Sequence, residues 1–319
     1  GQAAPELPPG VALKIFTGAP VPANATAVVR KEDTREIIDA AAGNSIVLQS
    51  QVSEGQNIRA RGENIRAGQV VLPAGQLLAG TKVVAAASFG GAEVAVHHEV
   101  RVCVLNTGDE LRRAGAPVEP WQIRDSNGPY LMESLGRQSW LNVRSSQHVP
   151  DALEETVQAI ENELETADAI ILSGGVSMGD ADYVPAAIKQ LGGHIIFHRL
   201  PIRPGKPVLG AVVSGKLVLG CPGNPASVAV TARIFGLPLL SKLAGIRQMS
   251  DPVHVEVANP DDKTLPLYWY RLVRVVEGGC VELVAGRGSG DVVALAASDG
   301  IIAVPPGQKG HGPWPYYPW

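Results

Sequence analysis

The stretch Asp168-Ala-Ile-Ile-Leu-Ser173-Gly-Gly175 predicts a buried β-strand that ends in a glycine-rich turn. Its apolar residues do not alternate with polar ones, which is typical of a strand that is covered on both faces of a parallel sheet. Residues 151–165, just before it, carry apolar side chains at i, i+4, i+7 and i+11, and this spacing predicts a helix. A helix followed by a buried strand is the repeating unit of a doubly wound sheet.

The same alternation extends over residues 100–246. Strands are expected at 100–106, 168–172, 194–197 and 216–220, and helices at 125–135, 151–165, 184–191 and 226–243. We therefore expect an α/β domain at 100–246 with an open, doubly wound, mostly parallel sheet.

Smaller β-rich parts are expected on either side of this domain. Residues 1–60 predict a small barrel-like or sandwich domain with strands at 11–17, 27–30 and 45–48. Residues 61–99 predict a connecting module with a helix at 80–89, and residues 247–319 a C-terminal β domain with strands at 253–257, 270–275 and 300–305. Aromatic side chains gather after residue 267, where they either fill a thin core or form a surface for a partner. The expected fold class is multidomain, α/β plus β.

The composition argues against several classes of protein. At 319 residues the chain is long enough for two or three domains. A net charge of −4 argues against a general nucleic-acid binder. The three cysteines lie far apart without a C-x-x-C pair, so neither a disulfide framework nor a zinc ribbon is expected. No apolar run approaches about 18 residues and no signal peptide is visible, so we expect no membrane span and a cytoplasmic location.

Four loops follow predicted strands: 107–110, 173–183, 199–207 and 221–227. They should meet at one edge of the sheet, because ligands of open α/β sheets bind outside the carboxyl ends of the strands. In the second loop, three glycines allow the backbone to approach a ligand and point N–H groups at an anion, and two serines add hydroxyl groups. These residues are Gly174, Gly175, Gly179, Ser173 and Ser177.

Cations and helix-start residues extend this edge. Arg199, Arg203 and Lys206 lie in a loop that three prolines stiffen, which favours binding of a phosphate or another oxyanion. Asn224 and Ser227 stand where a helix begins, so they either cap the helix or cap it and also contact a ligand.

Carboxylates at the same edge indicate a divalent metal. They are Asp109, Glu110, Asp125, Asp180 and Asp182. Oxygen ligands beside a phosphate site favour Mg²⁺, although any single one of these side chains could be a cap or a surface charge. The sequence has no Walker A motif, no G-x-S-x-G elbow and no zinc-type histidine spacing, and Gly286-Arg-Gly-Ser-Gly290 predicts a turn because no βαβ strand precedes it. The residues alone thus predict phosphate or nucleotide chemistry.

Seven short segments, taken in order, carry a family resemblance. They are Thr17-Gly-Ala-Pro-Val-Pro22, Gly62-Glu-Asn-Ile-Arg-Ala-Gly68, Asn106-Thr-Gly-Asp-Glu110, Arg124-Asp-Ser-Asn127, Ser173-Gly-Gly-Val-Ser-Met-Gly-Asp-Ala-Asp-Tyr183, Arg203-Pro-Gly-Lys-Pro207 and Pro222-Gly-Asn-Pro225. Together they resemble the molybdopterin molybdenumtransferases, the family that includes the E domain of gephyrin, over essentially the whole chain. The resemblance implies that adenylylated molybdopterin reacts with molybdate, assisted by Mg²⁺, and that AMP is released.

The resemblance also implies roles for single residues. Asp182, Asp125 and Glu110 match acidic active-site positions and would hold the metal. Catalytic roles are implied for these three and for Arg199, Arg203, Lys206 and Thr17. Cofactor-binding roles fall to Ser173, Gly174, Gly175, Ser177, Gly179, Pro222, Gly223, Asn224, Ser227 and Arg271. Thr17 matches a threonine that reaches the site from the partner subunit of a homodimer, and Arg271 matches an arginine near molybdate.

Departures from the family pattern leave alternatives open. The family's N-terminal segment with an Asp-Gly element has no counterpart here, so we expect one carboxylate and part of the dimer-forming domain to be missing. Asp291-Val-Val stands where serines are usual. The alternatives are a non-catalytic molybdopterin-binding or scaffold protein and a molybdopterin adenylyltransferase, which shares the Ser-Gly-Gly-Val-Ser segment. An adenylyltransferase is also considered as a partner, whereas no nucleic acid or membrane is expected.

Overall fold

The computed structural model describes residues 4–39, 43–144, 147–177, 179, 182–247 and 251–319. The chain divides into two compact units, Gly1–Pro73 and Ala74–Trp319. The finer division at residues 60, 99 and 246 stays a prediction.

The first unit holds little regular structure. A 3-10 helix, Lys31–Asp33, leads into β1 (Thr34–Ile37), which pairs antiparallel with β2 (Ser45–Leu48). The strand expected at 45–48 is therefore confirmed. Every residue of β2 is exposed. Among the described residues of the first unit, the sheet structure consists of this two-stranded ladder.

The strands expected at 11–17 and 27–30 are wrong, and with them the barrel or sandwich. These residues have no strand partner. The contacts of Val28 show what replaces a ladder: its N–H donates to the carbonyl of Gln56 at 2.9 Å and its own carbonyl accepts from the Asn57 side chain at 2.8 Å. Backbone N–H and C=O groups that would pair in a β-ladder are here hydrogen-bonded to a turn and to a side chain instead.

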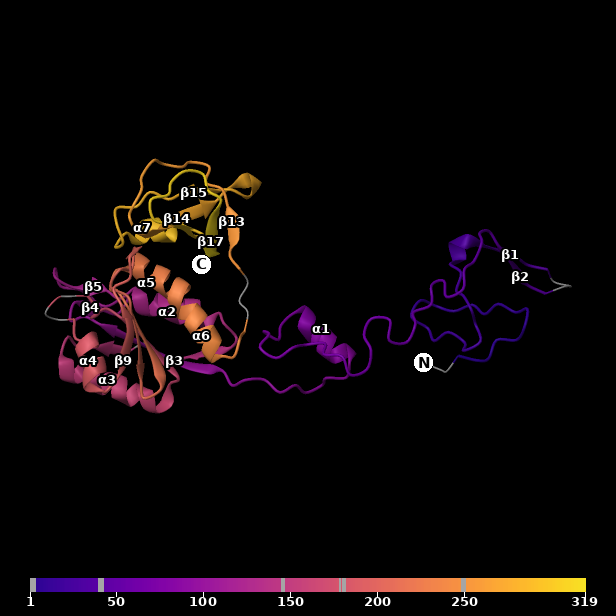
Figure 1. Cartoon of the computed structure of the whole chain (residues 1–319), viewed down its shortest axis with the longest axis horizontal. Helices are drawn as coiled ribbons and strands as arrows, with labels where there is room; N and C mark the ends of the chain where they lie inside the picture. Colours follow the sequence, from indigo (N-terminus) through magenta and orange to yellow (C-terminus); the bar gives the residue numbers. More distant parts are fainter. Residues whose placement is uncertain (1–3, 40–42, 145–146, 178, 180–181, 248–250) are drawn as a thin grey trace. The chain divides into compact units, whose positions relative to one another are not determined.

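A seven-stranded sheet forms the centre of the second unit (Figure 1). Its order is β6-β3-β8-β12-β11-β9, with β7 also paired to β3. The strands are β3 Val100–Thr107, β6 Leu141–Val143, β7 Gln147–Val149, β8 Ala169–Ser173, β9 His194–His198, β11 Leu209–Val213 and β12 Lys216–Cys221. Strand β3 is parallel to β6, β7 and β8, and β8 is parallel to β12, whereas β11 is antiparallel to β12 and β9. The expected mostly parallel sheet is confirmed.

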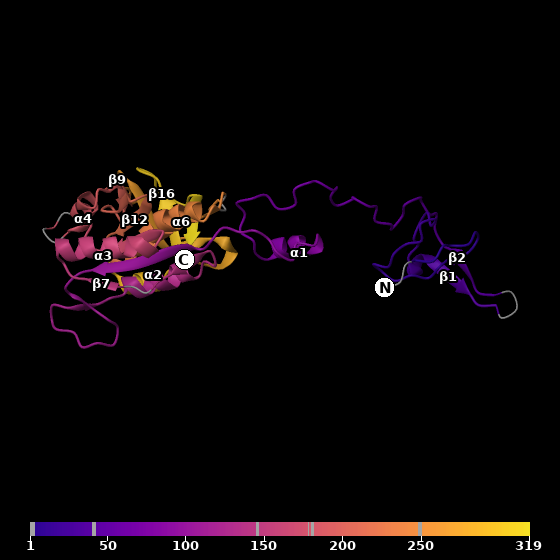
Figure 2. The ribbon, with the colours of Figure 1, turned by 90° about the horizontal axis from the view of Figure 1, so that it is seen from below.

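The five expected helices are present, with ends shifted by a few residues. They are α1 Thr81–Ser88, α2 Asn127–Gly136, α3 Leu153–Thr166, α4 Val184–Gln190, and one long helix that comprises α5 Pro225–Thr231, a π-helical turn Ala232–Gly236 and α6 Leu237–Leu243. Helices α3 and α4 cover one face of the central sheet and α2, α5 and α6 the other (Figure 1). The turned view shows α3 running alongside β7 (Figure 2).

Neighbouring residues of one strand belong to different cores, as a doubly wound sheet requires. In β8, Ile171 packs in the core that includes Leu131 of α2, whereas Leu172 packs in the core that includes Ile160 of α3 and Ile188 of α4. All of these side chains are fully buried. This two-sided burial explains the unbroken apolar run of the strand.

The helix Pro225–Leu243 also bears on the membrane question. It has 19 residues and a mean hydropathy of 1.3. Among the described residues, it is a helix whose length and composition would suit a membrane span. However, 61% of that window is buried inside the protein, where it covers the central sheet. A buried core helix meets the same criterion, so the finding is weak support for a span.

The C-terminal part of the second unit is a second sheet, in the order β10-β14-β16-β17-β13, with β15 paired to β14. The elements are β10 Ile202–Arg203, β13 Val253–Val255, β14 Tyr268–Val275, β15 Val281–Leu283, α7 Val292–Ala296, β16 Gly300–Val304 and β17 Trp314–Pro318. Trp314 and Tyr316 lie in its core with Val273 and Ile302. Two of the seven late aromatic residues thus fill this core, while Tyr268 is 46% exposed.

Several strands were not expected from the sequence, and two of them, β11 and β17, were missed for different reasons. Strand β11 is short and follows a proline-rich loop, yet it forms a hairpin with β12 through Ser214-Gly215, whose φ angles are +49° and +78°. A Ser-Gly pair between two apolar runs is a hairpin signal that could have revealed it. Strand β17 contains Pro315 and Pro318, and prolines argue against a strand.

The shorter elements complete the second unit. Strand β4 (Leu111–Arg112) pairs parallel with β5 (Ile123–Arg124), and a 3-10 helix spans Glu277–Gly279. The β4–β5 ladder fixes the segment that carries Glu110, because the N–H of Ile123 donates to the Glu110 carbonyl at 2.9 Å.

Close packing at Gly210 gives a test of the central sheet. A Cβ atom at Gly210 would overlap the ring of Phe197 on β9. Gly210→Ala should therefore lower the free energy of unfolding by about 1–3 kcal/mol, the usual range for overpacking a core. Chemical denaturation of the whole chain measures it. Gly136→Ala is the matched control, since nothing lies within 4 Å of its Cβ position and it ends α2. Equal effects of the two changes would contradict this packing.

Candidate functional site

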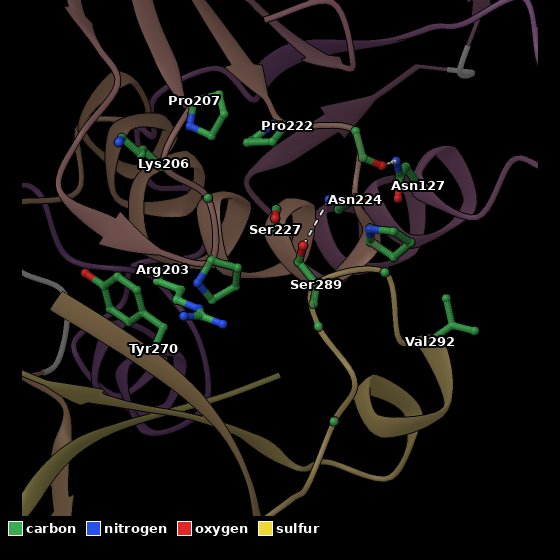
Figure 3. Close-up of a pocket in the computed structure, with 18 of the residues that line it drawn as sticks. Asn127, Arg203, Lys206, Pro207, Pro222, Asn224, Ser227, Tyr270, Ser289 and Val292 are labelled. Atoms are coloured by element: carbon green, nitrogen blue, oxygen red, sulfur yellow. Dashed lines mark hydrogen bonds between the residues drawn. The ribbon is translucent and has the colours of Figure 1, made fainter. Parts of the chain in front are cut away.

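A cavity of about 1360 Å³ opens in the second unit, between the carboxyl ends of central strands and the C-terminal sheet. The segments 107–110, 173–177, 203–207 and 222–227 form its lining on the side of the central sheet. Residues 269–272 of β14 and 283–290 form the lining on the side of the C-terminal sheet (Figure 3). The expectation that four loops meet at one edge is confirmed, because each of the four contributes to this lining.

Most of the residues singled out from the sequence lie at this cavity. The structure brings together Glu110, Ser173, Gly174, Gly175, Ser177, Asp182, Arg203, Lys206, Pro222, Gly223, Asn224, Ser227 and Arg271. Their chemical roles stay predictions.

Four of the singled-out residues of the second unit do not line the cavity: Asp109, Asp125, Gly179 and Arg199. Both carboxylate oxygens of Asp125 are engaged, one by the Gly128 N–H at 2.9 Å and the other by the Asn106 side chain at 3.1 Å. Asp125 therefore caps the start of α2 instead of facing the cavity.

Gly179 and Arg199 have other hydrogen-bond partners. The Gly179 N–H donates to a carboxylate oxygen of Asp182 at 2.6 Å, which orients that acid. The N–H of Arg199 donates to the carbonyl of Val208 at 3.0 Å, and its side chain does not line the cavity. Thr17 belongs to the first unit, and Asp180 lies outside the described residues.

The turn after β8 needs glycine for close packing. Gly174 and Gly175 have φ angles of +94° and +65°, and a Cβ atom on Gly174 would lie 2.7 Å from the Thr107 hydroxyl. The expectation that these glycines point N–H groups at an anion is not met at two positions. The Gly174 N–H donates to the carbonyl of Cys221 at 3.0 Å, and that of Gly179 is taken by Asp182. Close approach of the backbone is the physical reason for glycine here.

Asn224 joins the two sides of the cavity. It occupies the N-cap position of α5, but its side chain makes no capping bond. Its Nδ2 instead donates to Oγ of Ser289 at 2.9 Å (Figure 3), and the N–H of Ala226 donates to the Ser289 carbonyl at 3.0 Å. The glycine-rich segment 286–290, expected to be an ordinary turn, therefore belongs to the site.

Two arginines of the cavity stack on one tryptophan. Trp269 on β14 has the guanidinium of Arg271 at 4.1 Å from its ring centroid and that of Arg203 at 5.9 Å. Arg271 also forms a two-bond ion pair with Asp261, at 2.7 and 2.5 Å, which lowers the pKa of that carboxyl. An anion that binds Arg271 must therefore compete with Asp261. Neither Arg203 nor Lys206 forms an ion pair with any residue that the structure describes.

The metal prediction concerns Glu110, Asp182 and Asp125. Glu110 and Asp182 both line the cavity. Within the described ranges, however, no group of three or more His, Cys, Asp or Glu side chains is close enough to hold a metal ion. The three predicted ligands are thus not gathered into one set, because Asp125 is committed to the start of α2.

Asn127, Trp269 and Asp261 line the cavity but were not singled out as site residues. Asn127 ends the Arg124-Asp-Ser-Asn127 segment of the family resemblance, and this was the one sequence feature that pointed to it. The other two become visible only through the register of β14, which the sequence alone does not give.

Comparisons with known proteins agree with this architecture. The family described as "Probable molybdopterin binding domain" matches residues 103–242, and "MoeA N-terminal region (domain I and II)" matches residues 1–90. The molybdopterin molybdenumtransferase of Synechococcus elongatus is 36% identical over 305 residues, which cover 94% of this chain and 74% of that protein. The enzyme of the same name from a Nostoc species is 33% identical over 95% of this chain and 70% of its own length.

Solved structures show the same fold. A molybdopterin biosynthesis moeA protein of Pyrococcus horikoshii is 25% identical, with a TM-score of 0.73 over 99% of this chain and 76% of that one. A second structure of the protein from that organism has a TM-score of 0.79 at 24% identity, over 99% of this chain and 77% of the other.

The ion pair of Asp261 with Arg271 gives a stability test. Asp261→Asn should lower the free energy of unfolding by about 1.5–3 kcal/mol near neutral pH, the range for hydrogen bonds to charged groups. Since the folded-state pKa of Asp261 is lowered, the difference from wild type should persist above its ordinary pKa of 3.8 and shrink as the pH falls through the lower folded value. Denaturation as a function of pH measures it.

Asp262→Asn is the control for this pair. The Asp262 side chain is 96% exposed and pairs with Lys309, so its loss should leave stability nearly unchanged. A difference between Asp261→Asn and wild type that grows at acid pH would contradict the assignment.

Proposed function

The chain belongs to the molybdopterin molybdenumtransferase family, and on that premise we propose that it transfers molybdenum from molybdate to adenylylated molybdopterin with release of AMP. The observation that carries the proposal is one cavity lined by Arg203 and Lys206 together with Glu110 and Asp182. A phosphate linkage and an oxyanion both need cations, and carboxylates are the usual protein ligands of a magnesium ion beside them. Relatives matched across 94% of the chain bear the transferase name, so we favour this reaction over adenylylation and over non-catalytic binding.

Lys206 and Arg203 are the proposed binding groups for the phosphate linkage and for molybdate. Both are exposed toward the cavity and carry no competing ion pair with a described residue. Charge that develops on the departing phosphate oxygen of AMP would be stabilised by these cations in the transition state. Ser177, exposed in the turn after β8, is the proposed hydroxyl donor to the oxyanion.

Magnesium fits the residues that line the cavity. Mg²⁺ is usually bound through one or two carboxylates, with substrate phosphates and water as the other ligands. Asp182 and Glu110 would supply those carboxylates, which agrees with the absence of a three-residue cluster among the described residues. When bound, the ion would neutralise phosphate charge. Asp125 is the proposed positioning residue, since it holds the start of α2.

We also propose a homodimer in which Thr17 reaches the cavity of the partner subunit. The first unit supports this because its apolar side chains are uncovered: Phe16, next to Thr17, is 82% exposed, Ile38 78% and Val70 74%. Uncovered apolar surface of this kind is typical of a protein–protein interface. Arg271 would approach molybdate only by releasing Asp261.

A cytoplasmic location and a donor of substrate complete the proposal. Cys103, Cys221 and Cys280 are free thiols, which suits a reducing compartment. Burial raises the pKa of Cys103 and of Cys221 to about 12, so these two are structural rather than reactive. The adenylylated substrate would come from a molybdopterin adenylyltransferase.

The experiment that tests the function measures AMP release from adenylylated molybdopterin. We expect release to require both molybdate and Mg²⁺. Lys206→Ala should raise KM for the adenylylated substrate roughly 10- to 150-fold, equivalent to about 1.5–3 kcal/mol for a hydrogen bond to a charged group. Lys189→Ala, on exposed α4 surface outside the cavity, is the matched control. No AMP release by the wild-type chain would refute the proposal.

The dimer has its own test in analytical ultracentrifugation. We expect the wild-type chain to sediment as a dimer and Phe16→Glu to shift it toward monomer, because a charge would be buried in the interface. Ile196→Glu, at a site 61% exposed on the second unit, should leave the dimer intact. A monomeric wild-type protein at micromolar concentration contradicts the proposal.

A further inference from the structure

Two buried polar atoms at the strand end of the cavity have no hydrogen-bond partner among the described residues. They are Oδ1 of Asn127 and Oγ1 of Thr107. The two residues are only 7% and 8% exposed, and both line the cavity. An unsatisfied buried polar group costs about 1–3 kcal/mol, so each such atom calls for an explanation.

The orientation of the Asn127 amide is fixed by its neighbours. Its Nδ2 donates to the carbonyl oxygen of Gly223 at 2.7 Å and to Oγ of Ser173 at 2.8 Å. A backbone carbonyl can only accept, so the group that faces Gly223 must be the NH₂ end. Both N–H bonds are thereby used, and Oδ1 is left as a buried acceptor without a donor among the described residues.

Thr107 lies in the same corner of the cavity. Its hydroxyl packs on the turn after β8: a Cβ atom would lie 2.7 Å from Oγ1 at Gly174 and 3.0 Å from it at Gly175. Gly174 follows Ser173, the residue to which Asn127 bonds. The two glycines let the backbone turn pack directly on the hydroxyl, and both polar atoms stay buried at the cavity lining without a partner among the described residues.

This corner favours a neutral ligand group. The hydrogen-bond partners of the Asn127 amide are a hydroxyl and a backbone carbonyl, and neither carries a charge. Arg203 and Lys206 lie across the view from Asn127 (Figure 3). An anion would bind at the cations, whereas an N–H donor suits an amide oxygen that lacks a partner.

We propose that Asn127 and Thr107 bind the amino-substituted edge of a neutral heterocycle. The exocyclic amino group donates to Oδ1 of Asn127, and Oγ1 of Thr107 pairs with the adjacent ring nitrogen. The proposal rests on the proposed function, whose substrate carries two heterocycles of this chemistry, a pterin and an adenine. The anionic linkage of that substrate then extends toward Lys206.

The test compares ligands that differ in the amino group. The first pair is AMP and IMP, in which a carbonyl replaces the amino group. The second is 6-hydroxymethylpterin and 6-hydroxymethyllumazine, which differ in the same way. Titration calorimetry with the wild-type chain should show that one pair is discriminated at least roughly tenfold in favour of the amino member, because the wrong ligand leaves buried acceptors unpaired. The pair that is discriminated identifies which heterocycle occupies the corner.

Variants separate direct recognition from a structural role. Asn127→Ala should bring the affinity ratio of the discriminated pair close to one, and Thr107→Val, which keeps the side-chain shape, should lower the ratio as well. A purely structural role of Asn127 would weaken both ligands of the pair and preserve their ratio. Asn259→Ala is the matched control: Asn259 also lines the cavity, but its amide oxygen and one of its N–H bonds pair with the backbone of Leu283, so the ratio should stay at the wild-type value.

Two results would overturn the inference: a wild-type ratio near one in both pairs, which includes failure to bind any of the four probes, or a ratio that survives in both Asn127→Ala and Thr107→Val. The Thr107 variant keeps the test decisive if Asn127→Ala fails to fold. AMP release by the wild-type chain is measured in parallel. No discrimination by the wild-type chain together with intact AMP release refutes this inference alone, whereas discrimination by the wild-type chain without AMP release refutes the proposed function.

Discussion

A two-residue parallel ladder holds the C-terminal sheet against the central domain. Ile202 pairs with Tyr268 and Arg203 with Trp269, and the N–H of Tyr268 donates to the carbonyl of Pro201 at 3.1 Å. Without this ladder, the ends of β3, β8 and β12 would face solvent rather than a cavity. The bond from Asn224 to Ser289 closes the opposite side. These two contacts place the central sheet and the C-terminal sheet on opposite sides of one cavity, which the polar groups of both sheets line.

The ladder also explains how charge is arranged. It sets Arg203 on the ring of Trp269, and two positions further along β14 it sets Arg271 on the same ring. Stacking holds guanidinium groups in place while leaving their edges available for hydrogen bonds. Asp261 already uses the edge of Arg271, whereas Arg203 and Lys206 line the cavity without an ion pair to a described residue. The neutral side chains of Asn127 and Thr107 line another part of the same cavity.

The sequence predicted the central domain well because its signals are local. An unbroken apolar run such as 169–172 can only be a covered strand in this context, and the loops after such strands converge by topology alone. The expected positions of β3, β8, β9 and β12 and of the helices were therefore confirmed. The strand predictions at 11–17 and 27–30 in the first unit were wrong because these short apolar segments have the composition of strands but no partner strand.

The hydrogen bonds of some predicted site residues differ from expectation because the residue type suits two uses. Asp125 has the chemistry of a metal ligand and of a helix cap, and only the positions of Asn106 and Gly128 decide for the cap. Gly174 suits an anion-binding turn, but Cys221 takes its N–H. The pairing of Arg271 with Asp261 depends on side-chain packing that no spacing rule contains.

The central claim is that oxyanion chemistry takes place in this one cavity, at its cationic end. Crystals of the whole chain soaked in tungstate, a heavy analogue of molybdate, would test it through the anomalous scattering of tungsten. The account predicts an anomalous peak inside the cavity within contact distance of Arg203 and Lys206. A peak only elsewhere on the molecule, with the cavity empty at the same tungstate concentration, would contradict it.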